Sequence, residues 1–126
     1  HRSPDGNAFS ILWGTDECLL AGLALGATGA VGSTYNFAAP IYHRIMAAFA
    51  KNDFATARLE QKRSVDLVAR LASIGYMGAA KAVMEMLGVP IGPARLPHAN
   101  PETSQIMALE KDLEEMGFFD WVKPGT

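Results

Sequence analysis

The sequence predicts an α/β fold that starts with two parallel strands and continues with helices alone. Residues 10–14 form a short apolar run that ends at a glycine, as buried strands often do. Residues 28–34 form a second run built from very small side chains, which indicates close approach of backbone or ligand. Leucine-rich residues 17–27 suit a short helix between them. A strand, a helix and a strand in this order form a parallel pair.

Two parallel strands do not make a stable sheet by themselves. The pair leaves two open edges, and both runs are too apolar to face water. We therefore expect an incomplete chain whose two strands are the last two of a larger barrel and whose remaining residues form helices. The expected organisation is residues 1–36 for the last two barrel strands with their helix, and residues 37–126 for the carboxy-terminal helices of the barrel and its extension.

Helix signals run through the rest of the chain. Pro40 can open a helix, and Asn52 can cap the next one. That second helix has a 3–4 spaced stripe expected to face the core, made of Phe54, Ala57, Gln61, Val65, Val68 and Ala72.

Two shorter helices are expected nearer the carboxyl end. Residues 79–87 form one that Gly88 ends, and three prolines make residues 89–99 an extended connection. Asn100 and Pro101 open the last helix. Its inward side chains would be Ile106, Leu109, Leu113 and Met116.

Composition excludes several function classes. The net charge is −2 with basic and acidic residues interspersed, so we expect neither a nucleic-acid partner nor a membrane surface. The longest apolar run, residues 19–33, is shorter than the ~20 residues that cross a bilayer. Cys18 is the single cysteine, which favours a reducing cytoplasm and a buried helix position. His43 and His98 lack ligand spacing, so we expect no metal site.

Polar residues follow both strands where each one ends. Gly14 precedes Asp16 and Glu17, and Ser33 lies at the end of the second strand. Adjacent strands of a parallel barrel end on the same face, which carries the active site. Carboxylates, hydroxyls and glycine backbone groups there suit a polyhydroxylated ligand. The alternative is that the two acidic residues only favour a helix N-terminus, and the pattern leaves both interpretations open.

A family resemblance favours the binding site. Residues 11–17 (ILWGTDE) and 26–36 (GATGAVGSTYN) closely resemble the last two strands of the N-acetylneuraminate lyases, in the dihydrodipicolinate synthase superfamily of eight-stranded barrels. Residues 81–88 and 92–97 resemble that family's helical extension, so the likeness covers nearly all of residues 11–120. The resemblance implies an α/β fold class, the carboxy-terminal part of a (β/α)8 TIM barrel followed by a helical extension. The resemblance implies that Gly14, Asp16, Glu17 and Ser33 contact the hydroxyl-bearing end of the sugar.

The resemblance also implies a Schiff-base aldolase that uses no metal or other cofactor. A lysine on the sixth strand forms an imine with N-acetylneuraminate, which is cleaved to pyruvate and N-acetylmannosamine. None of the lysines here is expected on a barrel strand, so this chain would supply sugar-binding residues and no catalytic residue. Its expected partners are sialic acid and pyruvate, the remainder of the barrel or another chain, and further copies in a homotetramer.

Two other functions stay open on the sequence. One is another pyruvate-dependent aldolase or dehydratase of the same superfamily, acting on a different 2-keto acid. The other is a non-catalytic helical interaction module whose strands only pack a core.

Overall fold

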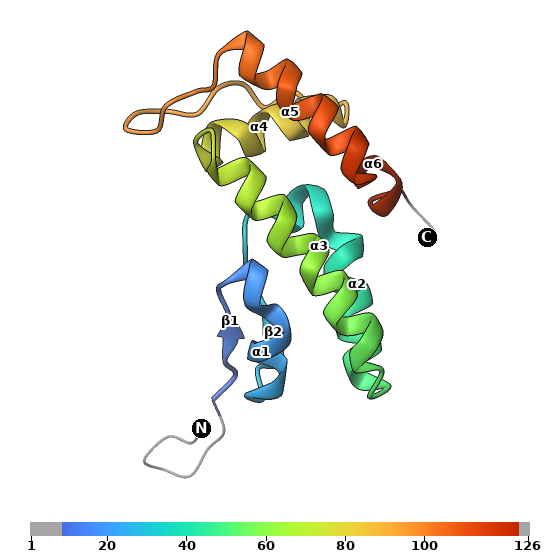
Figure 1. Ribbon diagram of the computed structural model, residues 1–126. Helices are drawn as coiled ribbons and strands as arrows, with labels where there is room; N and C mark the ends of the chain where they lie inside the picture. Colours follow the sequence, from blue (N-terminus) through green and yellow to red (C-terminus); the bar gives the residue numbers. More distant parts are fainter. Residues whose placement is uncertain (1–8, 124–126) are drawn as a thin grey trace.

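The first part of the chain forms a parallel pair of short strands, as predicted. The computed structural model describes residues 9–123. Strand β1 (Leu12–Trp13) pairs with β2 (Gly29–Ala30), with Leu12 opposite Gly29 and Trp13 opposite Ala30 (Figure 1). Both strands are shorter than the predicted runs 10–14 and 28–34. A residue belongs to a strand only where its backbone pairs with a neighbouring strand, and each strand has a single neighbour here.

A helical segment links the two strands and covers the first of them. It consists of the 3₁₀ turn η1 (Asp16–Cys18) and helix α1 (Leu19–Ala24), shorter than the predicted 17–27. The chain leaves α1 through Gly26, whose φ of +90° favours glycine. Gly22 packs on the Trp13 ring so closely that a Cβ at this position would overlap it. The absence of a side chain at Gly22 therefore lets α1 lie directly on β1.

Helix α2 (Tyr35–Ala50) consists of a first turn and a longer helix that meet at Ala38, and Pro40 lies in the first turn of the longer helix, where the sequence predicted a helix start. The helix is kinked at Ala38, where φ is −131° and ψ is 19°. Proline cannot donate the helical hydrogen bond, and its ring crowds the preceding turn, which explains a kink at this place. Residues 31–34 separate the end of β2 from the turn before the kink, which crosses the predicted boundary at residue 36.

Helix α3 (Phe54–Ala72) is the longest helix and differs from its prediction in cap and in buried face. Its N-cap is Asp53, whose carboxylate accepts a 3.1 Å hydrogen bond from Thr56 N–H. The predicted cap, Asn52, instead turns the chain with a φ of +58°. The buried face consists of Ala57, Glu60, Ser64, Leu67 and Leu71.

The predicted α3 stripe was wrong by about one residue because two of the buried positions are polar. Phe54 and Val65, which belonged to the predicted stripe, are exposed. Glu60 and Ser64 are buried through an ion pair and hydrogen bonds. A search for apolar periodicity does not count such positions.

The carboxy-terminal helices are α4 (Tyr76–Met86), α5 (Thr103–Met116) and α6 (Phe118–Trp121). Gly88 follows α4 with a φ of +83°, as expected of a helix-ending glycine. Helix α5 is capped by Glu102 with Gln105, and not by the predicted Asn100. The side chain of Asn100 instead binds the backbone N–H and carbonyl of Ala94, at 2.7 and 3.0 Å, and thereby closes the extended connection.

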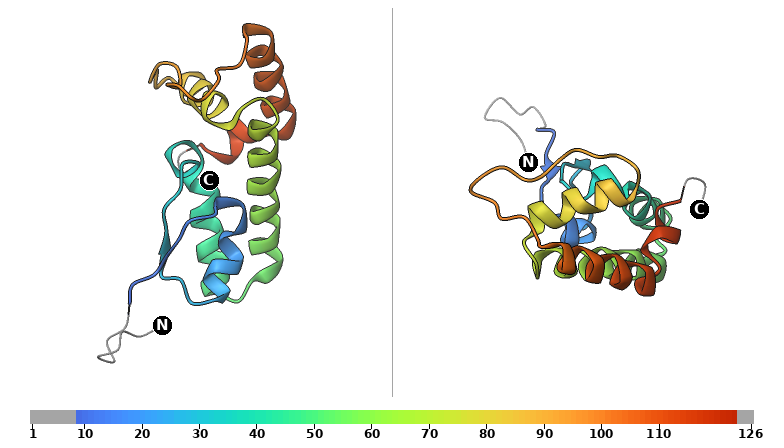
Figure 2. Two further views of the ribbon diagram at one scale, coloured as in Figure 1. Left: turned by 90° about the vertical axis from the view of Figure 1, so that its left-hand side faces the viewer. Right: turned by 90° about the horizontal axis from the view of Figure 1, so that it is seen from above.

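The helices share one core, and α3 connects its two ends. Figure 2 shows α3 running from beside α1 to the group formed by α4, α5 and α6. The fully buried side chains include Ile41, Ile45, Leu67, Leu71, Leu109, Leu113 and Phe118. On the strand side, by contrast, Leu12 and Val31 are 54% and 64% exposed.

Within residues 9–123, no helix is by itself both long and apolar enough to cross a membrane. Helices α3 and α4 meet the length and composition only as a pair, and they are bent by 112° relative to each other.

Candidate functional site

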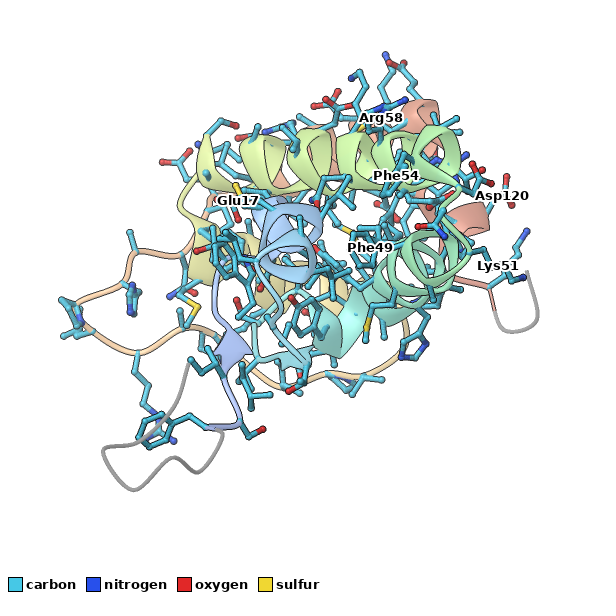
Figure 3. All side chains as sticks on the ribbon, turned by 90° about the horizontal axis from the view of Figure 1, so that it is seen from below. Glu17, Phe49, Lys51, Phe54, Arg58 and Asp120 are labelled. Atoms are coloured by element: carbon cyan, nitrogen blue, oxygen red, sulfur yellow. The ribbon has the colours of Figure 1, made fainter. Side chains whose placement is uncertain are left out.

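The four residues predicted to form a site line one cavity. Gly14, Asp16, Glu17 and Ser33 border a hollow of ≈ 390 Å³ at the carboxyl ends of β1 and β2. Glu17 lies between α3 and the start of α1 (Figure 3). The other lining residues are Thr15, Gly32, Val68, Ala72 and Tyr76. The structure thus brings together the two strand ends that the sequence placed side by side.

The Asp16 carboxylate joins the two strand ends. Its Oδ2 accepts hydrogen bonds from the Thr34 backbone N–H at 3.0 Å and from the Thr34 hydroxyl at 2.5 Å. The N-cap of η1 is Thr15, and no side chain caps this turn. Asp16 and Glu17 do lie in the first turn of η1, as the alternative interpretation expected, but the Asp16 carboxylate bonds to Thr34 and does not cap the backbone of its own turn.

Gly32 makes room for this carboxylate. A Cβ at Gly32 would overlap Asp16 Oδ1, so only glycine fits beside it. Asp16 Oδ1 and the Tyr35 hydroxyl are both buried and have no hydrogen-bond partner within the described residues. Burial, and then the nearby Asp16 charge, raise the pKa of Tyr35. The Asp16 carboxylate is therefore enclosed, with one oxygen bonded to Thr34 and the other beside Gly32.

A buried hydroxyl chain runs from Asp16 into the helices. Thr34 Oγ1 shares a 2.7 Å hydrogen bond with the Tyr42 hydroxyl, which lies 2.8 Å from Ser64 Oγ. Burial raises the pKa of Tyr42 to about 12, although the Ser64 and Thr34 hydrogen bonds lower it. These contacts join Thr34, the N-cap of α2, to the middle of α2 and the middle of α3.

Helix α3 also holds the backbone of η1. The Gln61 amide accepts a 2.8 Å hydrogen bond from Leu20 N–H and donates one of 3.3 Å to the Asp16 carbonyl. The Ser64 hydroxyl donates to the same carbonyl at 3.4 Å. Sequence reasoning assigned Gln61 to a core stripe and missed this role, since only its contacts reveal which backbone groups it satisfies.

Tyr76 is a site residue that sequence reasoning missed. Its hydroxyl lies 2.8 Å from Ser33 Oγ, and it borders the cavity from the start of α4. Burial raises the pKa of Tyr76, while the Ser33 hydrogen bond acts in the opposite direction. The signal that could have located it is Gly75, because a glycine before an apolar helix marks a turn that can aim the next side chain.

The remaining candidates lie outside this cavity. Cys18 is an exposed free thiol, so the prediction of a buried cysteine is wrong. It is the last residue of η1, directly before α1. None of the lysines borders the cavity. In the described part of the chain, no three His, Cys, Asp or Glu side chains gather in a way that could hold a metal ion.

The fold and the site define the class of protein. Two parallel strands whose carboxyl ends border a polar cavity, followed by covering helices, have the architecture of the carboxy-terminal part of a TIM barrel. The family model described as "Dihydrodipicolinate synthetase family" matches residues 3–116. The chain belongs to this family.

Curated relatives point to one branch of the family. The chain is 36% identical to an N-acetylneuraminate lyase of Rattus norvegicus over 122 residues, which are 94% of this chain and 38% of that protein. It is 39% identical to an N-acetylneuraminate lyase of Gallus gallus over 110 residues, or 86% of this chain and 36% of that protein. The chain therefore spans less than two fifths of the length of these relatives.

Solved structures confirm the predicted fold class. An N-acetylneuraminate lyase from Aliivibrio salmonicida superposes with a TM-score of 0.84 at 34% identity, covering 93% of this chain and 39% of that one. One from Proteus mirabilis has the same TM-score at 30% identity, covering 91% and 39%. One from Fusobacterium nucleatum, complexed with pyruvate, has a TM-score of 0.78 at 27% identity, covering 89% and 37%.

Proposed function

We propose that this chain is the sugar-binding part of a Schiff-base aldolase that cleaves N-acetylneuraminate to pyruvate and N-acetylmannosamine. The observation that carries the proposal is the meeting of Gly14, Asp16, Glu17 and Ser33 in one cavity at the strand ends. The similarity to a named N-acetylneuraminate lyase covers 94% of this chain and supports it. The non-catalytic interaction module gives no reason for four polar or glycine positions to border one cavity.

The cavity residues suit a polyhydroxylated chain. Glu17 is half-buried, and its carboxylate has no hydrogen-bond partner among residues 9–123, so it is available to accept from sugar hydroxyls. Hydrogen bonds to a charged acceptor are stronger than those between neutral groups. Ser33 can donate or accept, and Gly14 exposes backbone beside them. In this proposal Asp16 holds the two strand ends in place through its hydrogen bond with Thr34.

The bond-breaking step requires a lysine from another part of the barrel. Its amine condenses with C2 of the open-chain sugar acid, releasing water and forming a protonated imine. Removal of the C4 hydroxyl proton breaks the C3–C4 bond, and the electron pair passes into the imine. The sugar half leaves as N-acetylmannosamine, and the enamine is protonated and hydrolysed to pyruvate and free lysine. The scheme needs no metal and no cofactor.

The partners and compartment belong to the same proposal. Leu12 of β1 and Val31, the residue after β2, are exposed, and the remainder of the barrel, or another chain, would pack there. By its resemblance to the family the intact protein would be a homotetramer. A reducing cytoplasm suits a chain with a single, free cysteine.

The test is pyruvate release by the intact protein that carries this chain. It is incubated with N-acetylneuraminate, and pyruvate is measured by a coupled dehydrogenase. A second sample receives pyruvate and borohydride, and mass spectrometry looks for a reduced adduct on one lysine. Release together with an adduct supports the proposal. An adduct without release would indicate an aldolase or dehydratase for a different 2-keto acid, and neither would indicate a non-catalytic module.

A further inference from the structure

One contact connects the cavity to the distal helices. The Tyr76 hydroxyl lies 2.8 Å from Ser33 Oγ, although the two residues are 43 positions apart. Ser33 belongs to the end of the strand pair, and Tyr76 is the first residue of α4. The ring of Tyr76 also borders the cavity, beside Val68 and Ala72 of α3.

The position of Tyr76 is set by the packing of α4 against the extended connection. Gly75, with a φ of +93°, forms the turn between α3 and α4. Gly78 packs on that connection so closely that a Cβ there would come within 2.7 Å of the Ala99 carbonyl and 2.6 Å of Pro101 Cδ. The turn at Gly75 and the close packing of Gly78 thus fix the start of α4, and they fix the position of Tyr76 with it.

We propose that Tyr76 is a positioning residue for the sugar, acting through Ser33, so that the helical extension takes part in substrate selection. This inference rests on the proposed function. A serine hydroxyl alternates among three staggered rotamers. The Tyr76 hydroxyl selects the one in which Ser33 Oγ stays at the cavity wall, facing the hydroxyl-bearing chain. The pyruvate half of the substrate does not depend on this contact.

A double-mutant cycle in the intact protein tests the inference. The four proteins are wild type, Ser33→Ala, Tyr76→Phe and the double variant. Each is assayed for N-acetylneuraminate cleavage and for borohydride trapping of pyruvate. We expect Tyr76→Phe to raise KM three- to tenfold, about the value of one neutral hydrogen bond, with pyruvate trapping unchanged. In the Ser33→Ala background, Tyr76→Phe should have no further effect, because its partner is already gone.

Tyr42→Phe is the matched control. It also removes a phenol hydroxyl, but one bonded to Thr34 and Ser64 and outside this cavity. When Tyr42→Phe is combined with Ser33→Ala, the fold-changes in KM of the two single variants should multiply. When Tyr76→Phe is combined with Ser33→Ala, they should not. Thermal unfolding of each variant identifies a merely structural role, which would lower Tm and pyruvate trapping together.

Three results would overturn the inference. The first is a KM of Tyr76→Phe equal to that of wild type. The second is a double variant whose increase in KM is the product of the increases in the two single variants. The third is a fall in pyruvate trapping in Tyr76→Phe that parallels the fall in cleavage. A wild type that does not cleave N-acetylneuraminate is a different result. It refutes the proposed function, and the inference about the sugar falls with it.

Discussion

Asp16 and Thr34 are joined by two hydrogen bonds to one carboxylate oxygen, 3.0 Å from the backbone N–H and 2.5 Å from the hydroxyl. The residues follow different strands, so this pair closes the end of the sheet as a cross-link would. Asp16 is 7% exposed and Thr34 is fully buried. The neighbouring carboxylate, Glu17, has no such partner within the described residues, which separates the roles of two adjacent acidic side chains.

The first prediction compares these two carboxylates in the intact enzyme. Asp16→Ala and Glu17→Ala should each lower kcat/KM for N-acetylneuraminate roughly 10- to 100-fold, through loss of charge-assisted hydrogen bonds worth about 1.5–3 kcal/mol. Imine formation with pyruvate should change much less. Asp16→Ala should also lower the free energy of unfolding by a similar amount, because it leaves the Thr34 groups unpaired, whereas Glu17→Ala should not. Steady-state kinetics and denaturant unfolding measure both effects, and full kcat/KM in Glu17→Ala would remove that residue from the site.

The second prediction is that this chain alone has no lyase activity. None of its lysines borders the cavity, so no amine is placed to attack the substrate. Incubation with pyruvate and borohydride, followed by mass spectrometry, should give no stoichiometric adduct. Labelling of one lysine in every molecule would contradict this.

The third prediction concerns the strands of the isolated chain. Leu12 and Val31 are largely exposed, and an ordered backbone residue costs about 1–2 kcal/mol of conformational entropy that unpaired strands recover poorly. We expect ordered helices, with strand amides that either exchange quickly or are protected by association with another polypeptide. Sedimentation and hydrogen exchange measure this. A compact monomer with strand amides as protected as those of α3 would indicate a complete domain.

The fourth prediction concerns the buried Glu60. Its carboxylate lies 3.1 Å from Arg44 Nε and 2.6 Å from an Arg63 guanidinium nitrogen, and its side chain is 5% exposed. Arg63 in turn lies over the Trp121 ring at 5.0 Å, so the cluster joins α2, α3 and α6. Glu60→Gln would leave two guanidinium groups without their carboxylate and should cost about 3 kcal/mol of unfolding free energy.

The matched control for Glu60 is Asp66→Asn on the same helix. Asp66 pairs with Lys62 at 2.5 Å, but both side chains are well exposed. Such a pair contributes about 0–1 kcal/mol, so this variant should unfold close to wild type. If the two variants lost equal amounts of unfolding free energy, burial of Glu60 would not make its ion pairs more important for stability than an exposed pair.

The fifth prediction concerns alkaline pH. Burial raises the pKa of Tyr42 from 10.0 to about 12, so the folded protein keeps a proton that the unfolded chain releases. The stabilisation is complete below pH 10 and is lost as the pH rises towards 12. Tyr42→Phe should be less stable than wild type at pH 8, because it loses two buried hydrogen bonds, but its further decline above pH 10 should be shallower. Denaturant unfolding at several pH values measures the slopes, and parallel declines would contradict the assignment.

Local patterns predicted the strand pair and the proximity of the two strand ends, because apolar runs and the glycines that end them are visible in the sequence, whereas the binding-site interpretation came from the family resemblance. The apolar runs around Trp13 and Ala30 did form a parallel ladder, and the residues after them did meet. The errors arose where tertiary contacts override local preference. Phe54 and Val65 are exposed on α3, because Glu60 and Ser64 occupy buried positions through contacts with α2.

The missed site residues share one cause. Gln61, Ser64 and Tyr76 are polar or amphipathic side chains on helices, and each matters through a partner more than 40 residues away or on another helix. No spacing rule within a helix identifies such a partner. Only the packed structure shows that α3 satisfies the η1 backbone and that α4 reaches the cavity.

The long helix α3 has a consequence for how this protein can vary in length. It contacts η1 through Gln61 and Ser64 and borders the cavity one turn later through Val68 and Ala72. One inserted residue between these pairs would rotate the second pair by about 100°, since a helical turn takes 3.6 residues. Insertions and deletions should therefore be absent from α3 in related sequences. We expect insertions and deletions instead in residues 89–93. This stretch is exposed and comes before the hydrogen bonds between Ala94 and Asn100.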